Sequence, residues 1–199
     1  SKKIVVAMNG FYQEGLIPQM DGRVLPVISN IIVTRKLDED ELNVHNFKTF
    51  SPIANTKNLL YYYRKLPDNR ILFGTRGDLT GSDQSNLAMS VKMEKFLKDI
   101  FPKWSNVSID YNWRGLIALS QKLTPSIGKI DNEEIYYGFG YNGVGVSAAP
   151  WTGKQLSKLV FSSNSKELDI SKIYKGLPKK FVFPQLRTFY FRLAVWFYA

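Results

Sequence analysis

Residues 136–160 read YYGFGYNGVGVSAAPWTGKQLSKLV, and this stretch decides how the chain is interpreted. An aromatic pair typical of a strand leads into four glycines spaced G-x-G-x-x-G-x-G, and a helix-like run follows. A strand, a glycine turn and a helix together let a backbone approach phosphates and other electron-rich ligands. No ordinary dinucleotide fold is arranged around this spacing. The turn therefore predicts either a different ligand or a plain strand-to-helix connection without one.

The composition bounds the class of protein. A chain of 199 residues with 44% hydrophobic residues holds one large domain or one and a half small ones. The chain has no cysteine, which excludes disulfides, thiolate zinc sites and cysteine nucleophiles and fits a cytoplasmic protein. The one histidine, His45, lies in a polar stretch and is expected on the surface or in a loop. No metal-binding constellation is present.

The net charge of +10 raises the question of nucleic acid or an anionic membrane as partner. Lysine and arginine are scattered, and the nearest approach to a cluster is Lys175, Lys179 and Lys180, which argues against nucleic acid. The apolar tail FYFRLAVWFYA is too short to span a bilayer and carries Arg192, which argues against membrane association. No signal peptide is visible.

Hydrophobic periodicity and turn signals predict the order of elements. A hairpin is expected from residues 59–65 and 71–76 around the turn LPDN. A helix is expected over 85–101, with Leu87, Val91, Phe96, Leu97 and Ile100 on its apolar face. Further strands are expected at 3–8, 24–34, 107–120 and 134–137, a turn or short helix at 37–42, and helices at 147–162 and 185–198. This order predicts an α+β fold.

The first expected strand, residues 3–8, has the continuous apolar pattern of a strand buried on both faces of a parallel sheet. Such a strand needs neighbours and crossover helices, and nothing precedes this one. The chain is therefore expected to begin partway through a domain.

Four stretches together resemble the D-amino-acid-oxidase superfamily of FAD-dependent amine and amino-acid oxidoreductases. They are VVAMNG at 5–10, RKLPDNRILFGTR at 64–76, YNWRGLIALSQKLTPSIG at 111–128 and the glycine stretch quoted above. Their order and spacing match the family throughout. The tail FPQLRTFYFRLAVWFYA is similar to the end of the γ-glutamylputrescine oxidoreductase-like branch.

The resemblance implies the C-terminal half of such an enzyme, with FAD as cofactor of the complete protein. The implied parts are a closing strand and turn of an incomplete FAD-binding domain (1–20), a substrate-binding domain with a mixed or antiparallel sheet (21–125), a return to the FAD-binding domain (126–165) and a C-terminal tail (166–199). A missing N-terminal half would hold the G-x-G-x-x-G turn.

The resemblance also implies which residues contact the flavin. In family members the glycine turn packs against the flavin, and backbone amides stabilise negative charge that develops during its reduction. The expected flavin contacts in this chain are Gly10, Gly140, Tyr141, Asn142, Gly143, Val144 and Gly145. Val144 stands where the family often has histidine, so a catalytic side chain at that place is in doubt.

The 111–128 segment bears on the substrate. Amino-acid oxidases of the family often read G-L-R-P where this chain reads GLIA at 115–118, and Ile117 cannot clamp a carboxylate as arginine does. The implied substrate is an amine whose carboxylate, if any, lies far from the reacting carbon. Ser120 and Lys122 replace the usual threonine and aspartate, which puts an intact loop in doubt.

Four further residues are expected at the substrate. Tyr61 and Tyr63 lie in a tyrosine triplet on a predicted strand, where at least one ring should face the substrate. Arg76 is preferred over Arg70 for the active-site side, with a solvated surface arginine as the alternative. Trp113 stacks over the flavin or substrate, or else packs in the core.

The resulting hypothesis is the C-terminal part of an FAD-dependent oxidoreductase that oxidises a C–N bond to an imine by hydride transfer. Its partners would be a small amine or amino-acid substrate, the missing N-terminal half and, through exposed apolar surface, a second copy of the chain. The alternative is a truncated, inactive relative that persists as a folded remnant or binding module. A third interpretation, a basic protein that binds membranes or nucleic acid, rests on charge and tail alone.

Overall fold

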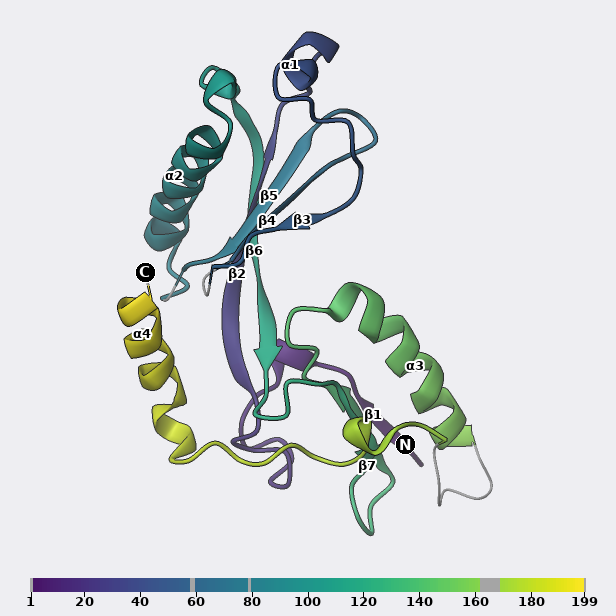
Figure 1. The fold of residues 1–199 in the computed structure, drawn as a ribbon. Coiled ribbons are helices and arrows are strands. Elements are labelled where there is room, and N and C mark those ends of the chain that lie inside the picture. The colour runs from purple at the N-terminus through teal and green to yellow at the C-terminus, as the bar shows by residue number, and fades with distance from the viewer. Residues whose placement is uncertain (1, 58–59, 79, 162–168, 199) are drawn as a thin grey trace. The chain divides into compact units, whose positions relative to one another are not determined.

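The computed structural model describes residues 2–57, 60–78, 80–161 and 169–198. The chain forms two compact units, one of residues 1–27 and 116–192 and the other of residues 28–115 and 193–199. Two sheets and several helices make up these units (Figure 1), which confirms the predicted α+β class. The predicted strand start at Leu59, helix end at Ser162 and domain boundary at 165/166 lie outside the described residues.

The first unit contains a three-stranded sheet in the order β1-β8-β7. β1 (Ile4–Val6) runs parallel to β8 (Ile135–Phe139), and β7 (Ser126–Lys129) runs antiparallel to β8. Successive side chains on β8 alternate between two cores. Tyr136 packs with Leu156 of α3 (Gly145–Phe161), and Tyr137 packs in the other core with Val6.

The first strand has the predicted parallel neighbour, but it is not buried on both faces in this chain. Ile4 and Val5 are each 49% exposed, and only Val6 of this strand is buried. Among the described residues β1 pairs with β8 alone and forms an edge of the sheet. An edge strand with one neighbour leaves apolar side chains accessible to water.

The second unit is built on a five-stranded sheet in the order β3-β4-β5-β2-β6. The strands are β2 (Leu25–Thr34), β3 (Ile53–Ala54), β4 (Tyr61–Lys65), β5 (Ile71–Arg76) and β6 (Ile109–Leu119). The predicted hairpin is confirmed as β4 and β5, whose turn is closed by the Leu66 N–H donating to the Arg70 carbonyl at 2.8 Å. Asn69 takes a φ of +65° in this turn, which asparagine tolerates well.

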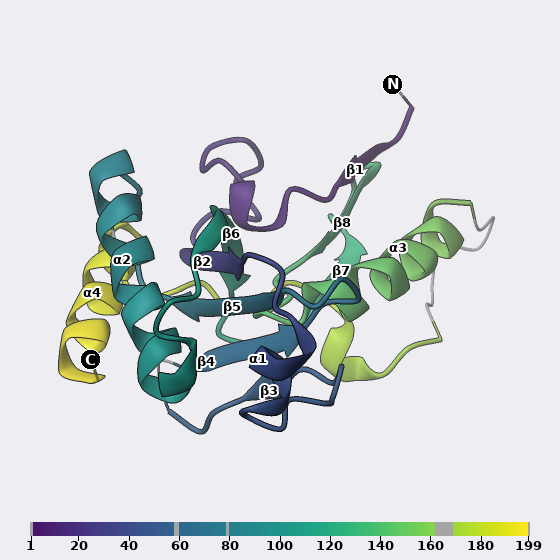
Figure 2. The ribbon, with the colours of Figure 1, turned by 90° about the horizontal axis from the view of Figure 1, so that it is seen from above.

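The helix α2 (Asp83–Ile100) packs along one face of this sheet (Figure 2). Ser82 caps its N-terminus by accepting the Ser85 N–H at 3.1 Å. The predicted apolar face is partly wrong, because Leu87 and Val91 are 64% and 69% exposed. The helix buries Met89, Met93 and Leu97 instead, at spacings of four residues. Unbranched methionine adapts to an irregular sheet surface where β-branched residues do not.

The remaining elements are short, apart from one helix. The acidic stretch forms α1 (Glu39–Asn43), and Asp38 and Glu41 make a reciprocal capping box at its start. The predicted terminal helix appears as a 3-10 turn (Pro184–Leu186) followed by α4 (Arg187–Tyr198). Other 3-10 turns lie at Asn9–Phe11, Pro102–Trp104 and Lys172–Tyr174. Within the described residues no helix is both long and apolar enough to cross a bilayer.

Candidate functional site

The glycine turn joins β8 to α3 by a sharp reversal of the backbone. Gly140, Asn142 and Gly143 take φ values of +75°, +52° and +97°. Residues with a Cβ atom adopt this left-handed region at a cost, and glycine and asparagine at the least. The letters GYNG at 140–143 therefore specify the turn, and α3 begins at Gly145, two residues earlier than predicted.

Two asparagines hold the turn from inside the protein. The Gly140 N–H donates to Asn9 Oδ1 at 3.0 Å, and the Asn142 N–H donates to the Ala118 carbonyl at 3.0 Å. Asn142 Oδ1 accepts the Ser120 N–H at 2.8 Å. Asn142, expected to contact the flavin, thus uses its side chain to tie the end of β6 to the turn. Asn9 was not predicted, although an asparagine before glycine combines a tolerated positive φ with a side-chain acceptor.

The amides at the start of α3 are available to an electron-rich group. Within the described residues no protein acceptor takes the N–H groups of Gly143, Gly145 or Val146. Gly143 is exposed, and a Cβ atom built on it would meet no heavy atom within 4 Å. The Val146 side chain is 97% exposed. The helix N-terminus adds partial positive charge, so this backbone fits the electron-rich edge of a flavin.

The other predicted contacts near the turn have different surroundings. Gly10 is buried, and a Cβ atom there would lie 2.9 Å from the Leu116 carbonyl oxygen, so its backbone packs closely against β6. Tyr141 is half-buried, and burial raises the pKa of its phenol, which keeps the side chain neutral. Val144 is 56% exposed and donates its N–H to the Tyr141 carbonyl at 2.9 Å.

The loop after β6 is folded in spite of its unusual residues. The Leu123 N–H donates to the Ser120 carbonyl at 3.2 Å, and Ser120 is buried. Lys122 Nζ donates to the carbonyls of Lys175 at 2.8 Å and Gly176 at 3.3 Å. Burial lowers the pKa of Lys122. Ser120 and Lys122 are therefore compatible with a folded loop, although the sequence had put an intact loop in doubt.

The second unit presents a sheet face on the side away from α2. Tyr62 lies opposite Gly74 in the β4–β5 register, and its hydroxyl is 3.0 Å from Ser29 Oγ. Arg76 lies opposite the same Ser29 in the β5–β2 register. These three side chains therefore share one face of the sheet.

Trp113 of β6 lies on this face too. The neighbouring Asn112 contacts Asn86 of α2 at 3.3 Å, so Asn112 is on the helix side and alternation places Trp113 on the opposite side. Trp113 is 45% exposed, which excludes the alternative of plain core packing. Ile117, four residues further along β6 in the first unit, is half-buried.

Tyr61 and Tyr63 pack on the α2 side of the sheet. The ring centroid of Tyr61 is 4.8 Å from that of Phe96, and Tyr63 meets Phe101 edge-on at 5.4 Å. Both rings belong to the aromatic core of the unit. The middle tyrosine of the triplet, Tyr62, is the one on the face away from α2. In the sequence, the signal for this placement of Tyr62 was Gly74, the residue that lies opposite it on β5.

The two candidate arginines differ in their partners. Arg70 forms ion pairs with Asp68 at 3.1 Å and Asp110 at 2.6 Å and donates to the Thr34 carbonyl. Within the described residues the guanidinium of Arg76 makes no hydrogen bond or ion pair. Arg70 is thus committed to the fold, while Arg76 keeps its donors available on the sheet face.

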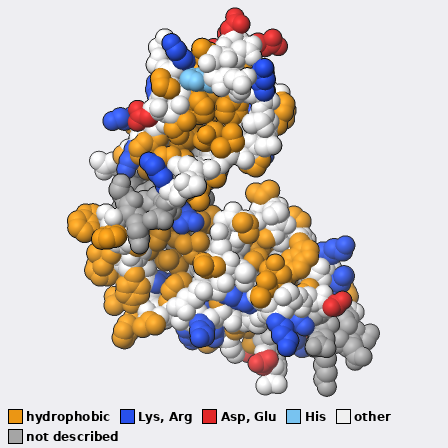
Figure 3. All heavy atoms as spheres, in the orientation of Figure 1, with side chains coloured by type: hydrophobic (Ala, Val, Ile, Leu, Met, Phe, Trp, Pro, Cys, Tyr) orange, Lys and Arg blue, Asp and Glu red, His pale blue; other side chains and the backbone are white. Residues whose placement is uncertain are grey.

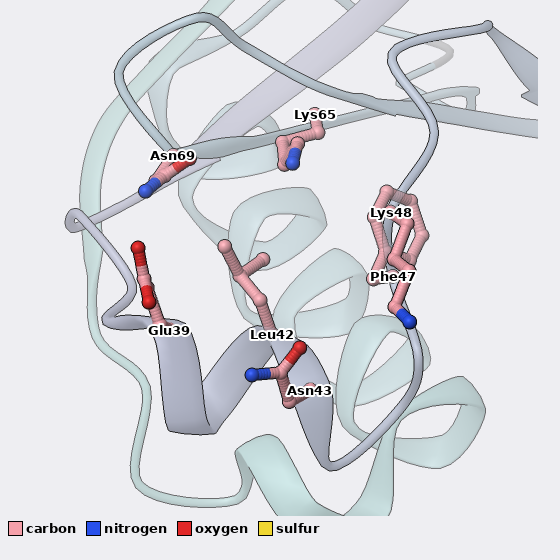
Figure 4. Close-up of a pocket in the computed structure, with 7 residues that line it drawn as sticks. All are labelled: Glu39, Leu42, Asn43, Phe47, Lys48, Lys65 and Asn69. Atoms are coloured by element: carbon pink, nitrogen blue, oxygen red, sulfur yellow. The ribbon is translucent and has the colours of Figure 1, made fainter.

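A cavity of about 300 Å³ lies elsewhere in the second unit, between α1 and the β4–β5 turn (Figure 4). Its lining residues are Glu39, Leu42, Asn43, Phe47, Lys48, Lys65 and Asn69. None of them was predicted as a site residue. The nearby His45 lies in the turn after α1, which confirms the expected loop position. It is half-buried there, and its ring packs edge-on against Phe101 and Trp104.

Known oxidoreductases share sequence with this chain. The family model of FAD-dependent oxidoreductases (DAO) matches residues 1–159. The chain is 31% identical over 160 residues to the γ-glutamylputrescine oxidoreductase of Escherichia coli, covering 80% of this chain and 37% of that protein. It is 29% identical over 184 residues to a probable oxidoreductase, OrdL, of Haemophilus influenzae, covering 89% and 39%.

Solved structures share the fold. Iminodiacetate oxidase from Chelativorans sp. BNC1 superposes with a TM-score of 0.64 at 17% identity, over 90% of this chain and 47% of that one. Glycine oxidase from Bacillus cereus gives a TM-score of 0.62 at 16% identity, over 84% and 44%. The chain thus spans less than half the length of these relatives.

Proposed function

This chain belongs to the DAO family of FAD-dependent oxidoreductases, and on that premise we propose that it supplies flavin contacts and substrate contacts to an enzyme that oxidises a C–N bond of an amine. Bound FAD would accept a hydride from the carbon next to nitrogen. The observation that carries the proposal is the glycine turn, which is held from inside by Asn9 and Asn142 while the amides of Gly143, Gly145 and Val146 stay available.

The first unit would hold the flavin ring. Backbone N–H groups at a helix N-terminus bind developing negative charge without a titrating side chain, so their effect does not change with pH. Gly143 permits a close approach because a ligand meets no side chain there. The neutral Tyr141 phenol and the apolar Val144 add no opposing charge.

The second unit would hold the substrate on the sheet face away from α2. Trp113 offers an exposed aromatic surface, Tyr62 a hydroxyl shared with Ser29, and Arg76 a guanidinium free to bind an acid group. This assignment replaces Tyr61 and Tyr63 by Tyr62, because the first two fill the aromatic core.

The proposed substrate class is an amine whose acid group, if it has one, is remote from the reacting carbon. Ile117 offers no hydrogen bond to a carboxylate, and a carboxylate placed beside it loses its water. The name of the 31%-identical relative, γ-glutamylputrescine oxidoreductase, agrees with a long amine. The alternative, an inactive folded remnant or binding module, keeps the same fold and predicts no turnover. The cytoplasmic location remains a prediction.

Tight FAD binding is proposed to need a second segment that corresponds to the N-terminal part of the relatives. The chain covers 37% of the E. coli protein, and Ile4 and Val5 on the β1 edge are each 49% exposed. A strand edge of this kind is a docking place for further strands, and without them it favours self-association. Titration of FAD against the pure chain, followed by its visible spectrum, should give no stoichiometric complex. A tight complex with the chain alone would refute this requirement.

The substrate class is tested with the N-terminal segment supplied. Long ω-amines or N-acylated diamines should bleach the flavin anaerobically faster than glycine, sarcosine or D-alanine. Ile117→Arg should shift preference towards small amino acids by about 10–100-fold, the worth of one bidentate carboxylate contact, while Ile117→Leu should leave it unchanged. If small amino acids win in the unmodified protein, another residue such as Arg76 clamps their carboxylate. If no amine bleaches a flavin that is bound, the remnant alternative holds.

A further inference from the structure

The C-terminal helix α4 carries a row of exposed apolar side chains. Trp196 and Phe197 are 81% and 77% exposed, and Leu193 is 50% exposed. The full row, here called the α4 stripe, is Leu186, Phe189, Tyr190, Leu193, Trp196 and Phe197. Exposed aromatic side chains of this size in a continuous row are uncommon on soluble proteins and mark interaction surfaces.

The spacing of the stripe places it on one side of the helix. From Leu186 its members follow at steps of three, four, seven, ten and eleven residues, which is the period of one helical face. Phe191 and Val195, on the other side, are half-buried. Hydrophobic side chains gather over α4 in the space-filling view (Figure 3). A helix that only packed against its own protein would bury its large apolar side chains. The helix α4 exposes them instead.

The C-terminal segment that contains the stripe is basic. Residues 170–199 contain six lysines or arginines and no aspartate or glutamate. Lys172, Lys179 and Lys180 are exposed, whereas Arg187 is paired with Glu14 at 2.5 Å. The family model ends at residue 159, before this segment. The segment thus joins an exposed aromatic face to exposed lysines, and it contains no acidic residue of its own.

We infer that the α4 stripe docks on the surface of an anionic lipid bilayer. A helix with tryptophan, phenylalanine and leucine on one face and lysine and arginine around it lies in the interface without spanning it. The twelve residues of α4 are too short to cross, so docking is peripheral. A second copy of the chain is the weaker occupant, because each copy has a net charge of +10 and brings the same basic segment to the contact.

The lysines and the exposed aromatic side chains should contribute separately to vesicle binding. Each lysine near an anionic surface contributes about fivefold in binding, from about 1 kcal/mol. Removing both Lys179 and Lys180 should therefore weaken binding about 30-fold or more, and replacing them by glutamate still more. Removing two large exposed aromatic side chains should weaken it at least about tenfold.

Flotation of the full chain with vesicles tests the inference. Binding is expected to vesicles of equal phosphatidylcholine and phosphatidylglycerol and to be lost with pure phosphatidylcholine. Trp196→Ala with Phe197→Ala should weaken it at least about tenfold, and separately Lys179→Glu with Lys180→Glu should weaken it more than about 30-fold. The matched controls lie on α2: Leu87→Ser with Val91→Ser removes apolar side chains of 64% and 69% exposure, and Lys92→Glu with Lys95→Glu makes the same charge change.

Both controls should keep vesicle binding, and circular dichroism should show that all four variants are folded. Absence of binding to the anionic vesicles would overturn the inference. Equal loss in the α2 charge control would assign binding to net charge alone and overturn it as well. If the chain does not bind vesicles but forms a dimer that the α4 variants dissociate, the stripe binds a second copy of the chain and the inference is overturned. Leu193→Glu, a single change, serves as a second test of the stripe if a double variant misfolds.

Discussion

The contact between Tyr62 and Gly74 can be tested by a single added methyl group. A Cβ atom at Gly74 would lie 2.1 Å from Tyr62 Cζ and 2.4 Å from its Cε2 and hydroxyl oxygen. Ordinary van der Waals contact begins at 3.4 Å, so the overlap exceeds 1 Å. Gly74 lies on β5, hydrogen-bonded between β2 and β4, so its backbone cannot move away easily. In Gly74→Ala the tyrosine ring must leave its place.

The cost has two parts. Displacing the ring breaks the hydrogen bond between the Tyr62 hydroxyl and Ser29 Oγ, worth about 0.5–1.5 kcal/mol. Forcing an extra carbon into a closely packed place costs about 1–3 kcal/mol. We expect Gly74→Ala to lower the free energy of unfolding by about 1.5–4.5 kcal/mol, measured by urea denaturation.

Gly115 of β6 supplies the matched control. It belongs to the same sheet, and a Cβ atom there would meet no heavy atom within 4 Å. Gly115→Ala should change stability by less than about 0.5 kcal/mol, and Tyr62→Phe should cost about 1 kcal/mol. In a Tyr62→Ala background, Gly74→Ala should cost under about 1 kcal/mol because the obstacle is gone. Equal effects of the two glycine substitutions, or no coupling to Tyr62, would refute this packing and the position of Tyr62 on the sheet face.

Three further predictions concern single side chains. Asn9→Ala should lower stability by about 1–3 kcal/mol in urea, since it leaves the Gly140 N–H without an acceptor, and Asn9→Asp should retain most of it. Burial, and then the charge of Lys103, lowers the pKa of His45 below its usual 6.5. The folded state then binds fewer protons than the unfolded chain, so stability held above pH 6.5 should fall as the pH drops below it, and His45→Phe should remove that dependence in thermal melts. Lys122→Met should destabilise by about 1–3 kcal/mol by leaving two carbonyls without their donor, while Lys122→Arg should cost less.

Local signals accounted for what the sequence predicted well. The hairpin followed from LPDN because proline, aspartate and asparagine each favour turn geometry on their own. The glycine turn followed from residues that tolerate positive φ most easily, and Gly140 and Gly143 do adopt it. Family motifs supplied the rest, since their order along the chain predicted which turn would contact the flavin.

What escaped prediction depends on contacts between distant residues. The bond from the Gly140 N–H to Asn9 joins positions 131 residues apart, and no local pattern specifies it. The buried face of α2 was misassigned because periodicity alone fits both the Leu87 and Val91 stripe and the Met89 and Met93 stripe. The choice between them depends on the sheet surface that the helix meets. Strand alternation predicted that the three tyrosines would divide between the two faces of the sheet. The sequence did not show which of these faces would meet α2.

Lys122 shows how such a contact changes the functional argument. In the sequence it replaces an acidic residue that the family usually has, and a reversed charge suggested a decaying loop. In the structure its half-buried side chain reaches the carbonyls of Lys175 and Gly176 and ties the loop to the C-terminal segment. The Gly176 N–H donates in turn to Ile127 of β7 at 3.2 Å. A lysine with a defined partner is a substitution that the fold uses, so this position no longer favours the remnant over a working half of an oxidoreductase. Because Ser120 of the same loop is held by Asn142, the loop and the glycine turn support one another, and a substitution that loosens either should weaken both.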